Sequence, residues 1–191
     1  MSYAGLSTKM PGMHRLTSVR YRSFGARCPW GGCLCGATSC MSGIAFVDSN
    51  ILIYAHDLDA GVKRERAAAK LHELWDSGTG RLSIQVLQEF YVNATRKLAT
   101  PIARSTAREI IKAYGVWVHH ATTVETVTRA IELSDLAQIT FWDALIVASA
   151  EEVDAHELLS EDLNDGQAIV GIKVVNPLKA GHTSSEVHDG R

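Results

Sequence analysis

Between residues 44 and 175, short apolar runs typical of β-strands alternate with longer stretches in which apolar residues recur at helical spacing. The expected strands are residues 44–47, 82–84, 116–119, 157–160 and 173–175. The expected helices are residues 49–56, 62–77, 85–98, 105–114, 124–137 and 142–153. This alternation is typical of β-α-β crossover units, in which helices cover a mainly parallel sheet. The sequence therefore predicts an α/β domain over residues 41–178.

Apolar side chains at helical spacing indicate which helix faces enter the core. The expected core sets are Val124, Val127 and Ile131; Leu71, Leu74 and Trp75; and Val86, Phe90 and Ala94. Residues 144–150 are apolar nearly all round, so we expect their helix to be buried.

The segments on either side of the domain show no hydrophobic period. We expect residues 1–40 to be a disordered extension and residues 179–191 to be a disordered tail. Met41 comes just before the first strand-like run and is the favoured native start. An organelle transit peptide is the alternative interpretation of residues 1–40.

All four cysteines lie inside the extension, with the spacing C-x4-C-x-C-x4-C: Cys28, Cys33, Cys35 and Cys40. Structural zinc sites usually combine C-x-x-C knuckles, so this spacing does not favour zinc. No apolar secretory signal precedes the cysteines, which argues against a disulfide framework. Residues 41–178 contain no cysteine, so a catalytic thiol is excluded there.

Charge is distributed unevenly along the chain. The basic residues before residue 41 are Lys9, Arg15, Arg20, Arg22 and Arg27, whereas all 21 Asp and Glu follow it. A general polyanion-binding surface is therefore not expected, and nucleic acid could bind only where metal ions offset the negative charge. No run approaches the roughly 18 apolar residues of a membrane span, so we expect a soluble, cytoplasmic protein.

Two acidic residues follow predicted strands. Asp48 comes directly after residues 44–47, and Asp162 follows residues 157–160. Because the carboxyl ends of parallel strands form the ligand-binding edge of an open α/β sheet, both side chains are expected at that edge. Structural alternatives are a helix cap for Asp48 and turn chemistry for Asp162.

Two further acidic residues lie on predicted helices. Asp143 stands in the first turn of the buried helix, where the helix dipole favours an anion. Glu89 lies beside the apolar stripe of its helix, and Asn93 one turn later could orient it. The structural alternatives are a helix cap for Asp143 and the start of a solvated helix side for Glu89.

Carboxylates gathered at one sheet edge would repel one another unless a cation lay between them. Oxygen ligands without Cys or His favour Mg²⁺ or Mn²⁺ over zinc. Such a site predicts phosphoryl chemistry, in which the metal activates a water and no protein nucleophile is needed. The chain also has no G-x-S-x-G, Walker or G-x-G-x-x-G motif.

Four segments, in this order, resemble the PIN-domain family and most closely its VapC-like toxins: residues 46–54, 82–91, 141–148 and 158–163. The resemblance covers about residues 44–178 and implies a three-layer α/β/α PIN-like domain. It implies a Mg²⁺- or Mn²⁺-dependent endoribonuclease that hydrolyses phosphodiester bonds of tRNA, rRNA or mRNA. It further implies a homodimer and inhibition by a cognate antitoxin protein, as in type II toxin-antitoxin systems.

By matching positions, the resemblance makes four acidic residues the catalytic and metal-binding groups: Asp48, Glu89, Asp143 and Asp162. Asn50 and Ser160 match supporting polar positions. Many family members have another Asp two residues after the fourth acid, where this chain has Asn164. Asp165, the next residue, is the candidate replacement as a metal ligand, and whether one or two metal ions bind stays open.

Basic residues near the Glu89 helix could meet RNA phosphates. Arg96 and Lys97 end that helix and are the candidate RNA-binding residues. Others follow in the next helix: Arg104, Arg108 and Lys112. Solvation of an exposed helix is the structural alternative.

Two other classes of function compete with a nuclease. A haloacid-dehalogenase-like phosphatase needs a second Asp two residues after the first, and this position is Asn50. A catalytically inactive PIN-like module that binds RNA or an antitoxin would carry a degenerate acidic set. The intact carboxylates argue against this second alternative.

Overall fold

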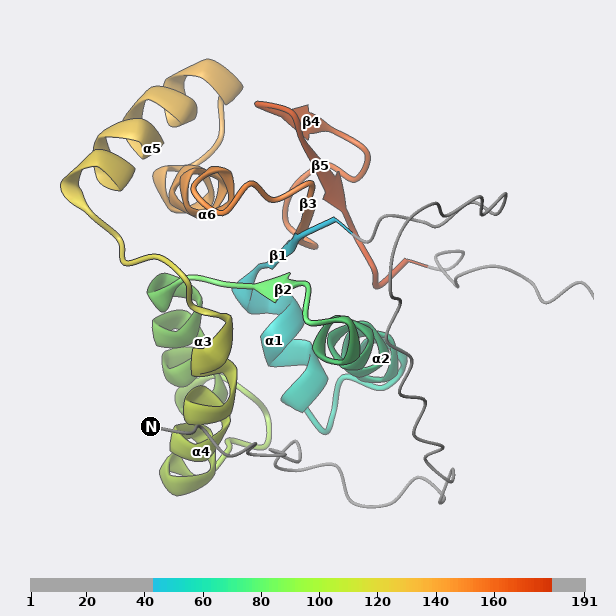
Figure 1. Cartoon of the computed structure of the whole chain (residues 1–191). Helices are drawn as coiled ribbons and strands as arrows, with labels where there is room; N and C mark the ends of the chain where they lie inside the picture. Colours follow the sequence, from blue (N-terminus) through green and yellow to red (C-terminus); the bar gives the residue numbers. More distant parts are fainter. Residues whose placement is uncertain (1–42, 180–191) are drawn as a thin grey trace, which may run out of the picture. The chain divides into compact units, whose positions relative to one another are not determined.

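The computed structural model describes residues 43–179, which contain a five-stranded sheet in the order β2-β1-β3-β5-β4 (Figure 1). The strands are β1 (Ala45–Val47), β2 (Gly80–Arg81), β3 (Glu157–Leu159), β4 (Ala168–Ile169) and β5 (Ile172–Val175). β1 pairs in parallel with β2 and β3, and β3 with β5, whereas β4 runs antiparallel to β5. The prediction of a mainly parallel sheet is confirmed. The expectations for residues 1–40, their cysteines, Met41 and residues 180–191 fall outside the described residues.

The register of the parallel strands aligns the carboxyl ends of β1 and β3. Val47 lies opposite Leu159, so the next residues, Asp48 and Ser160, are neighbours at one edge of the sheet. The Asp48 N–H donates to the Leu159 carbonyl over 3.0 Å, and the Ser160 N–H donates to the Val175 carbonyl over 3.1 Å. Sheet hydrogen bonding thus continues one residue beyond the strands and holds both positions.

Helices cover both faces of the sheet, with α5 and α6 on one face and α1 to α4 on the other (Figure 1). Their bounds are α1 (Ser49–His56), α2 (Val62–Ser77), α3 (Ile84–Arg96), α4 (Arg104–Tyr114), α5 (Val124–Ala137) and α6 (Phe141–Glu151). Each predicted helix is present, with its ends shifted by two residues at most. The predicted three-layer α/β/α arrangement is confirmed.

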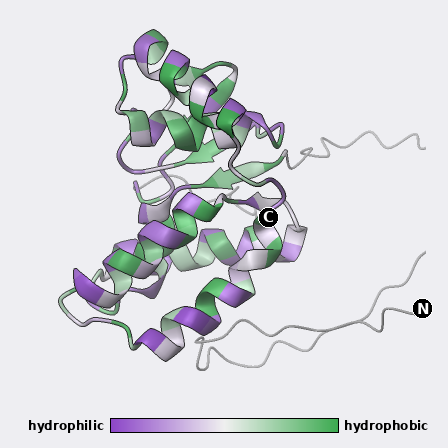
Figure 2. Cartoon of the chain, turned by 90° about the vertical axis from the view of Figure 1, so that its left-hand side faces the viewer, coloured by the Kyte–Doolittle hydropathy of each residue, from purple (hydrophilic) through white to green (hydrophobic). Residues whose placement is uncertain are grey.

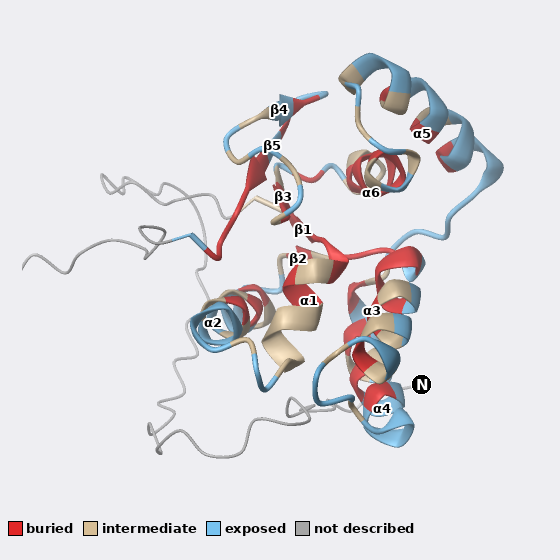
Figure 3. Cartoon of the chain, turned by 180° about the vertical axis from the view of Figure 1, so that it is seen from behind, coloured by how far each residue is buried: buried red, intermediate tan, exposed pale blue. Residues whose placement is uncertain are grey.

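The core lies between the sheet and the helices. Phe46, Leu158 and Val174 on the central strands are at most 1% exposed. Residues 144–150 of α6 are all buried, as predicted, and Figure 3 shows the same burial in the sheet. Figure 2 shows hydrophobic residues along the strands, whereas the helices carry both hydrophobic and hydrophilic residues. Within residues 43–179, no helix is both long and apolar enough to cross a membrane.

Two strand predictions differ from the structure by more than one residue, and one short strand was not predicted. Residues 116–119 were expected as a strand, but Gly115–Trp117 form a short 3₁₀ helix, η1. The tighter helix brings Trp117 onto the same side as Tyr114, with ring centroids 5.2 Å apart, and buries it. The second strand ends before residue 82, because Ser83 already caps α3. The short β4 was not predicted; Gly171, with φ +86°, closes its hairpin to β5.

The predicted buried face of α5 is wrong. Val124 and Ile131 are 76% and 54% exposed, whereas Thr126, Ala130 and Leu133 are buried. α5 packs on α6, and the small side chains of Thr126 and Ala130 allow a close approach. Helical spacing identified an apolar stripe on α5, but the face that packs in the structure is a different one.

The expected faces of α2 and α3 are largely confirmed. Leu71 and Leu74 of α2 are buried, and the α3 residues Val86, Phe90 and Ala94 are fully buried. Trp75 is only half-buried, but its ring packs against other aromatic rings.

A buried histidine at the end of α1 predicts acid sensitivity. The His56 ring packs edge-on against Phe90 and Tyr114, and its Nε2 has no hydrogen-bond partner among residues 43–179. Burial, with a smaller effect of the Arg64 charge, lowers the pKa of His56 from 6.5 to about 4. The unfolded chain therefore binds a proton on His56 more tightly than the folded chain. The stability that the folded state gains from neutral, buried His56 is complete above pH 6.5 and is lost as the pH falls toward 4.

We therefore expect His56→Phe to remove up to about 3 kcal/mol of the stability difference between neutral and acidic pH. Urea unfolding of both proteins at neutral pH and at about pH 4 measures it. His72→Phe is the control, because the His72 side chain is exposed on α2. An equal loss of stability on acidification in the wild type and in His56→Phe would contradict the prediction.

Candidate active site

Asp48 is the most deeply buried acidic residue at the carboxyl edge of the sheet, with 7% of its surface exposed. It follows β1 directly and also caps α1, because its Oδ1 accepts from the Ser49 N–H. Its Oδ2 accepts from the Ser160 hydroxyl over 2.8 Å. Asp48 therefore caps α1 and also lies at the carboxyl edge of the sheet, because the end of β1 and the start of α1 meet at this residue.

The electrostatic environment of Asp48 opposes its ionisation. Burial raises the pKa of Asp48 from 3.8 to about 6, against the lowering effect of the hydrogen bonds from Ser160 and Ser49. The negative charges of Glu89 and Asp162 raise it further. The three carboxylates therefore repel one another across this edge, as expected from the sequence.

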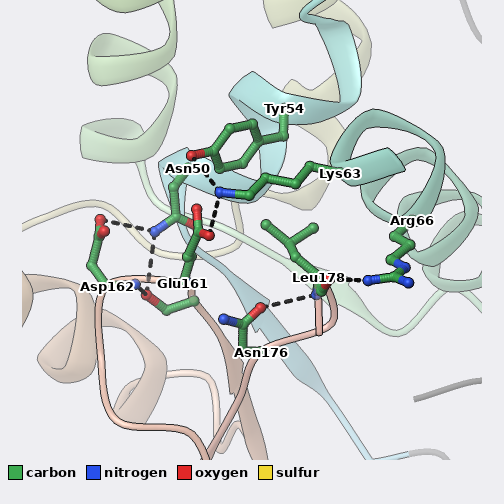
Figure 4. A network of polar contacts seen from close by, with 9 residues as sticks. Asn50, Tyr54, Lys63, Arg66, Glu161, Asp162, Asn176 and Leu178 are labelled. Carbon is green, nitrogen blue, oxygen red and sulfur yellow. Dashed lines mark hydrogen bonds and ion pairs between the residues drawn. The ribbon is translucent and has the colours of Figure 1, made fainter. Parts of the chain in front are cut away.

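Asn50 links the two acids that follow the strands. Its side-chain amide donates to Asp48 Oδ2 and to Asp162 Oδ2, over 3.0 Å in each case. It also lies 3.3 Å from the Ser160 hydroxyl, and its own oxygen accepts from the Glu161 N–H over 3.3 Å. Figure 4 shows Asn50 between the start of α1 and the loop after β3. Asn50 and Ser160, predicted as supporting polar residues, both donate hydrogen bonds to Asp48.

Glu89 reaches the same edge from α3. Its Oε2 accepts from the Ser49 hydroxyl over 2.6 Å, and its Oε1 accepts from Gln85 Nε2 over 2.8 Å. The contact with Ser49 joins Glu89 to Asp48, because Ser49 also donates its N–H to that residue. Asn93 is not among the partners of Glu89 in the described hydrogen bonds.

Asp143 approaches from the start of α6, but its carboxylate is engaged locally. The Thr140 hydroxyl donates to Asp143 Oδ2 over 2.7 Å and accepts from the Asp143 N–H over 3.2 Å. A link to α3 exists through the neighbouring backbone, since Gln85 Nε2 donates to the Trp142 carbonyl over 3.3 Å. Ser49 thus links Asp48 to Glu89, and Asn50 links Asp48 to Asp162, whereas the Asp143 carboxylate contacts Thr140 in the described hydrogen bonds.

The other predicted residues lie further from this network. Asp165 accepts from the Asn176 N–H over 2.9 Å and from Lys179 Nζ over 3.2 Å. Arg96 and Lys97 are exposed at the end of α3. Arg96 is seven residues from Glu89, which places it on the same helix face about 10 Å away.

Sequence reasoning missed two residues that hold the acids together. Ser49 and Gln85 both donate to Glu89, and Ser49 also contacts Asp48. Both stand next to predicted strand ends, but Ser and Gln are common at helix starts and gave no distinct signal. The loop acid Glu161 is paired with Lys63 over 2.5 Å, and Lys63 also lies over the Tyr54 ring (Figure 4).

The oxygen donors at this edge suit a hard divalent cation in their chemistry. A cation would offset the repulsion that raises the pKa of Asp48. The positions of these side chains do not form a metal site, because no group of three or more His, Cys, Asp or Glu side chains within residues 43–179 converges on one point. Ser49 and Asn50 lie between the acids and bridge them by hydrogen bonds.

A family model described as PIN domain matches residues 45–165, which span the strands, the helices and the carboxylates described above. The chain belongs to the PIN-domain family. PIN domains are generally nucleases and typically use divalent metal ions. The mainly parallel sheet with helices on both faces is therefore the PIN fold, as the resemblance of four short segments implied.

The chain is similar to chains in several solved structures. A toxin-antitoxin complex from Klebsiella pneumoniae contains a chain with 24% sequence identity and a TM-score of 0.51, over 70% of this chain and 97% of that one. FitAcB from Neisseria gonorrhoeae matches with 15% identity and a TM-score of 0.47, over 70% and 98%. Mycobacterium tuberculosis VapC20, titled a Sarcin-Ricin loop cleaving toxin, matches with 18% identity and a TM-score of 0.43, over 62% and 91%. No curated protein sequence matches the chain.

Proposed function

We propose that this PIN domain is a Mg²⁺- or Mn²⁺-dependent endoribonuclease and the toxin of a toxin-antitoxin pair. The observation that carries the proposal is the meeting of Asp48, Glu89 and Asp162, from three separate parts of the chain, around Ser49 and Asn50. Asp48 is buried in spite of the repulsion from Glu89 and Asp162, and this burial costs stability, so a purely structural role does not account for it.

Each acidic side chain has a distinct part in the proposed site. Asp48, Glu89, Asp143 and Asp162 would hold the cation once the side chains that Ser49 and Asn50 now bridge turned toward it, with Asp165 as an outer candidate. When bound, the cation supplies a water of lowered pKa and stabilises charge on the phosphate. Ser160 and Asn50 orient Asp48, and Asn50 also keeps Asp162 within reach. Glu89, which is half-buried, is positioned to accept a proton from water at the outer side of the site.

The substrate and partners rest on the family. RNA, as tRNA, rRNA or mRNA, is the substrate that the resemblance to VapC-like toxins implies. The Klebsiella pneumoniae chain of the same fold comes from a toxin-antitoxin complex, which supports a cognate antitoxin as partner. The proposal includes a homodimer in the cytoplasm. Arg96, on the same face of α3 as Glu89, and Lys97 would contact an RNA phosphate.

Incubating total bacterial RNA with the full chain in Mg²⁺, in Mn²⁺ and in EDTA tests the proposal. We expect discrete fragments that need the metal and that Asp143→Asn does not produce. Asp76→Asn is the matched control, because Asp76 is exposed on α2 and pairs only with His72 in the described contacts. Fragments unchanged in Asp143→Asn would overturn the site. A folded protein inactive with both metals would favour the binding-module alternative.

A further inference from the structure

Trp142 is a large aromatic side chain left in solvent at the edge of the proposed site. It is 62% exposed, and no other Phe, Tyr or Trp among residues 43–179 is classed as exposed. The rest of its helix is buried from residue 144 to residue 150. An exposed indole next to a buried helix gives up the stabilisation that burial would bring, so packing does not explain it.

The structure links the backbone of Trp142 to the proposed site through Gln85. The Trp142 carbonyl accepts from Gln85 Nε2, and the same nitrogen donates to Glu89 Oε1. Asp143 is the next residue in the chain, capped by Thr140. The Phe141 ring packs edge-on against the indole, with centroids 5.3 Å apart and planes at 69°. Trp142 thus stands in the first turn of α6, with its backbone tied to α3 through Gln85 and its exposed ring held against Phe141.

We propose that Trp142 is a positioning residue that stacks on an unpaired base of the RNA strand beside the bond to be cut. This inference rests on the proposed function and deepens it. Every base offers a flat π-face, so stacking on an aromatic side chain binds single strands with little dependence on sequence. A base stacked on Trp142 would bring the strand beside Asp143, the next residue in the chain.

A second protein surface fits this position less well. An apolar protein face over Trp142 would also approach Asp143, the next residue, and desolvating that charge without a counter-ion is costly. A nucleic acid strand offers an aromatic base to the Trp142 indole and leaves the carboxylates free to bind the cation. The observations therefore favour a single-stranded RNA base as the occupant.

Steady-state cleavage of a labelled single-stranded oligoribonucleotide by the full chain in Mg²⁺ gives the first test. We expect Trp142→Ala to raise KM about fivefold to 150-fold, the cost of losing one stacked base, with a much smaller change in kcat. Trp142→Phe keeps a ring and should restore most of the KM. Leu136→Ala is the matched control, because Leu136 is 71% exposed on α5 and should leave both constants unchanged.

A binding measurement separates this inference from the nuclease proposal. In the Asp48→Asn protein, titration with the same oligoribonucleotide should quench tryptophan fluorescence, and the added Trp142→Phe change should remove most of that quench. Quenching at Trp142 without cleavage by the wild type would support stacking while overturning the nuclease. Cleavage with KM unchanged in Trp142→Ala and no quench would overturn stacking while the nuclease stands. If Trp142→Ala left KM unchanged but converted a dimer of the protein to monomers, the ring would belong to a protein interface. That result would also overturn stacking.

Discussion

Asp48→Asn should abolish RNA cleavage and yet leave the domain folded and more stable in EDTA. The loss of rate should exceed about 100-fold, since removing even an outer partner of a metal ligand costs up to that much.

The gain in stability follows from the buried charge of Asp48. Because the pKa of Asp48 is raised from 3.8 to about 6, the folded state binds its proton more tightly than the unfolded chain. Ionised Asp48 therefore costs up to about 3 kcal/mol at neutral pH, and Asn carries no such cost.

Thermal unfolding in EDTA, as a function of pH, measures this gain. The wild type should lose stability as the pH rises from 3.8 through about 6, so its gap to Asp48→Asn should narrow on acidification. The three donors around Asp48 can adapt, because the Ser160 hydroxyl and the Asn50 amide can both rotate. A variant that unfolds more easily than the wild type at neutral pH, or that still cleaves RNA, contradicts the expectation. Asp76→Asn should change neither property.

Phe90→Ala should lower the free energy of unfolding by about 3–5 kcal/mol, a large part of the total for a domain of this size. Phe90 is 0% exposed, and its ring packs edge-on against His56 with centroids 5.6 Å apart. The cavity would lie beneath α3, the helix that carries Glu89. We therefore expect cleavage to fall as well, through the displaced carboxylate.

Urea unfolding at neutral pH measures this cost. Val92→Ala is the control on the same helix, because Val92 is 41% exposed and its truncation should change stability by less than about 0.5 kcal/mol. A loss below about 1 kcal/mol for Phe90→Ala would mean that α3 does not depend on this ring for its packing.

Local chemistry was enough to predict the helices and the position of Asp48. The run Ala45–Val47 is short and apolar, and Asp48 with Ser49 then starts a helix, so the strand end and the cap are readable in neighbouring residues. The predictions for residues 116–119 and for the buried face of α5 were wrong, because tertiary contacts determined these features more than the local sequence did. Trp117 joined an aromatic cluster instead of a strand, and α5 turned its small residues toward α6.

The sequence by itself determined the α/β class, the membership of the PIN family and the acids that follow the strands, because these depend on periodicity and on residue type over short spans. The folded structure alone decided which groups meet. Ser49 reaches Glu89 across 40 residues, and Asn50 reaches Asp162 across 112. No local pattern carries such pairings, because they follow from the register of β1 with β3 and from the packing of α3 beside α1.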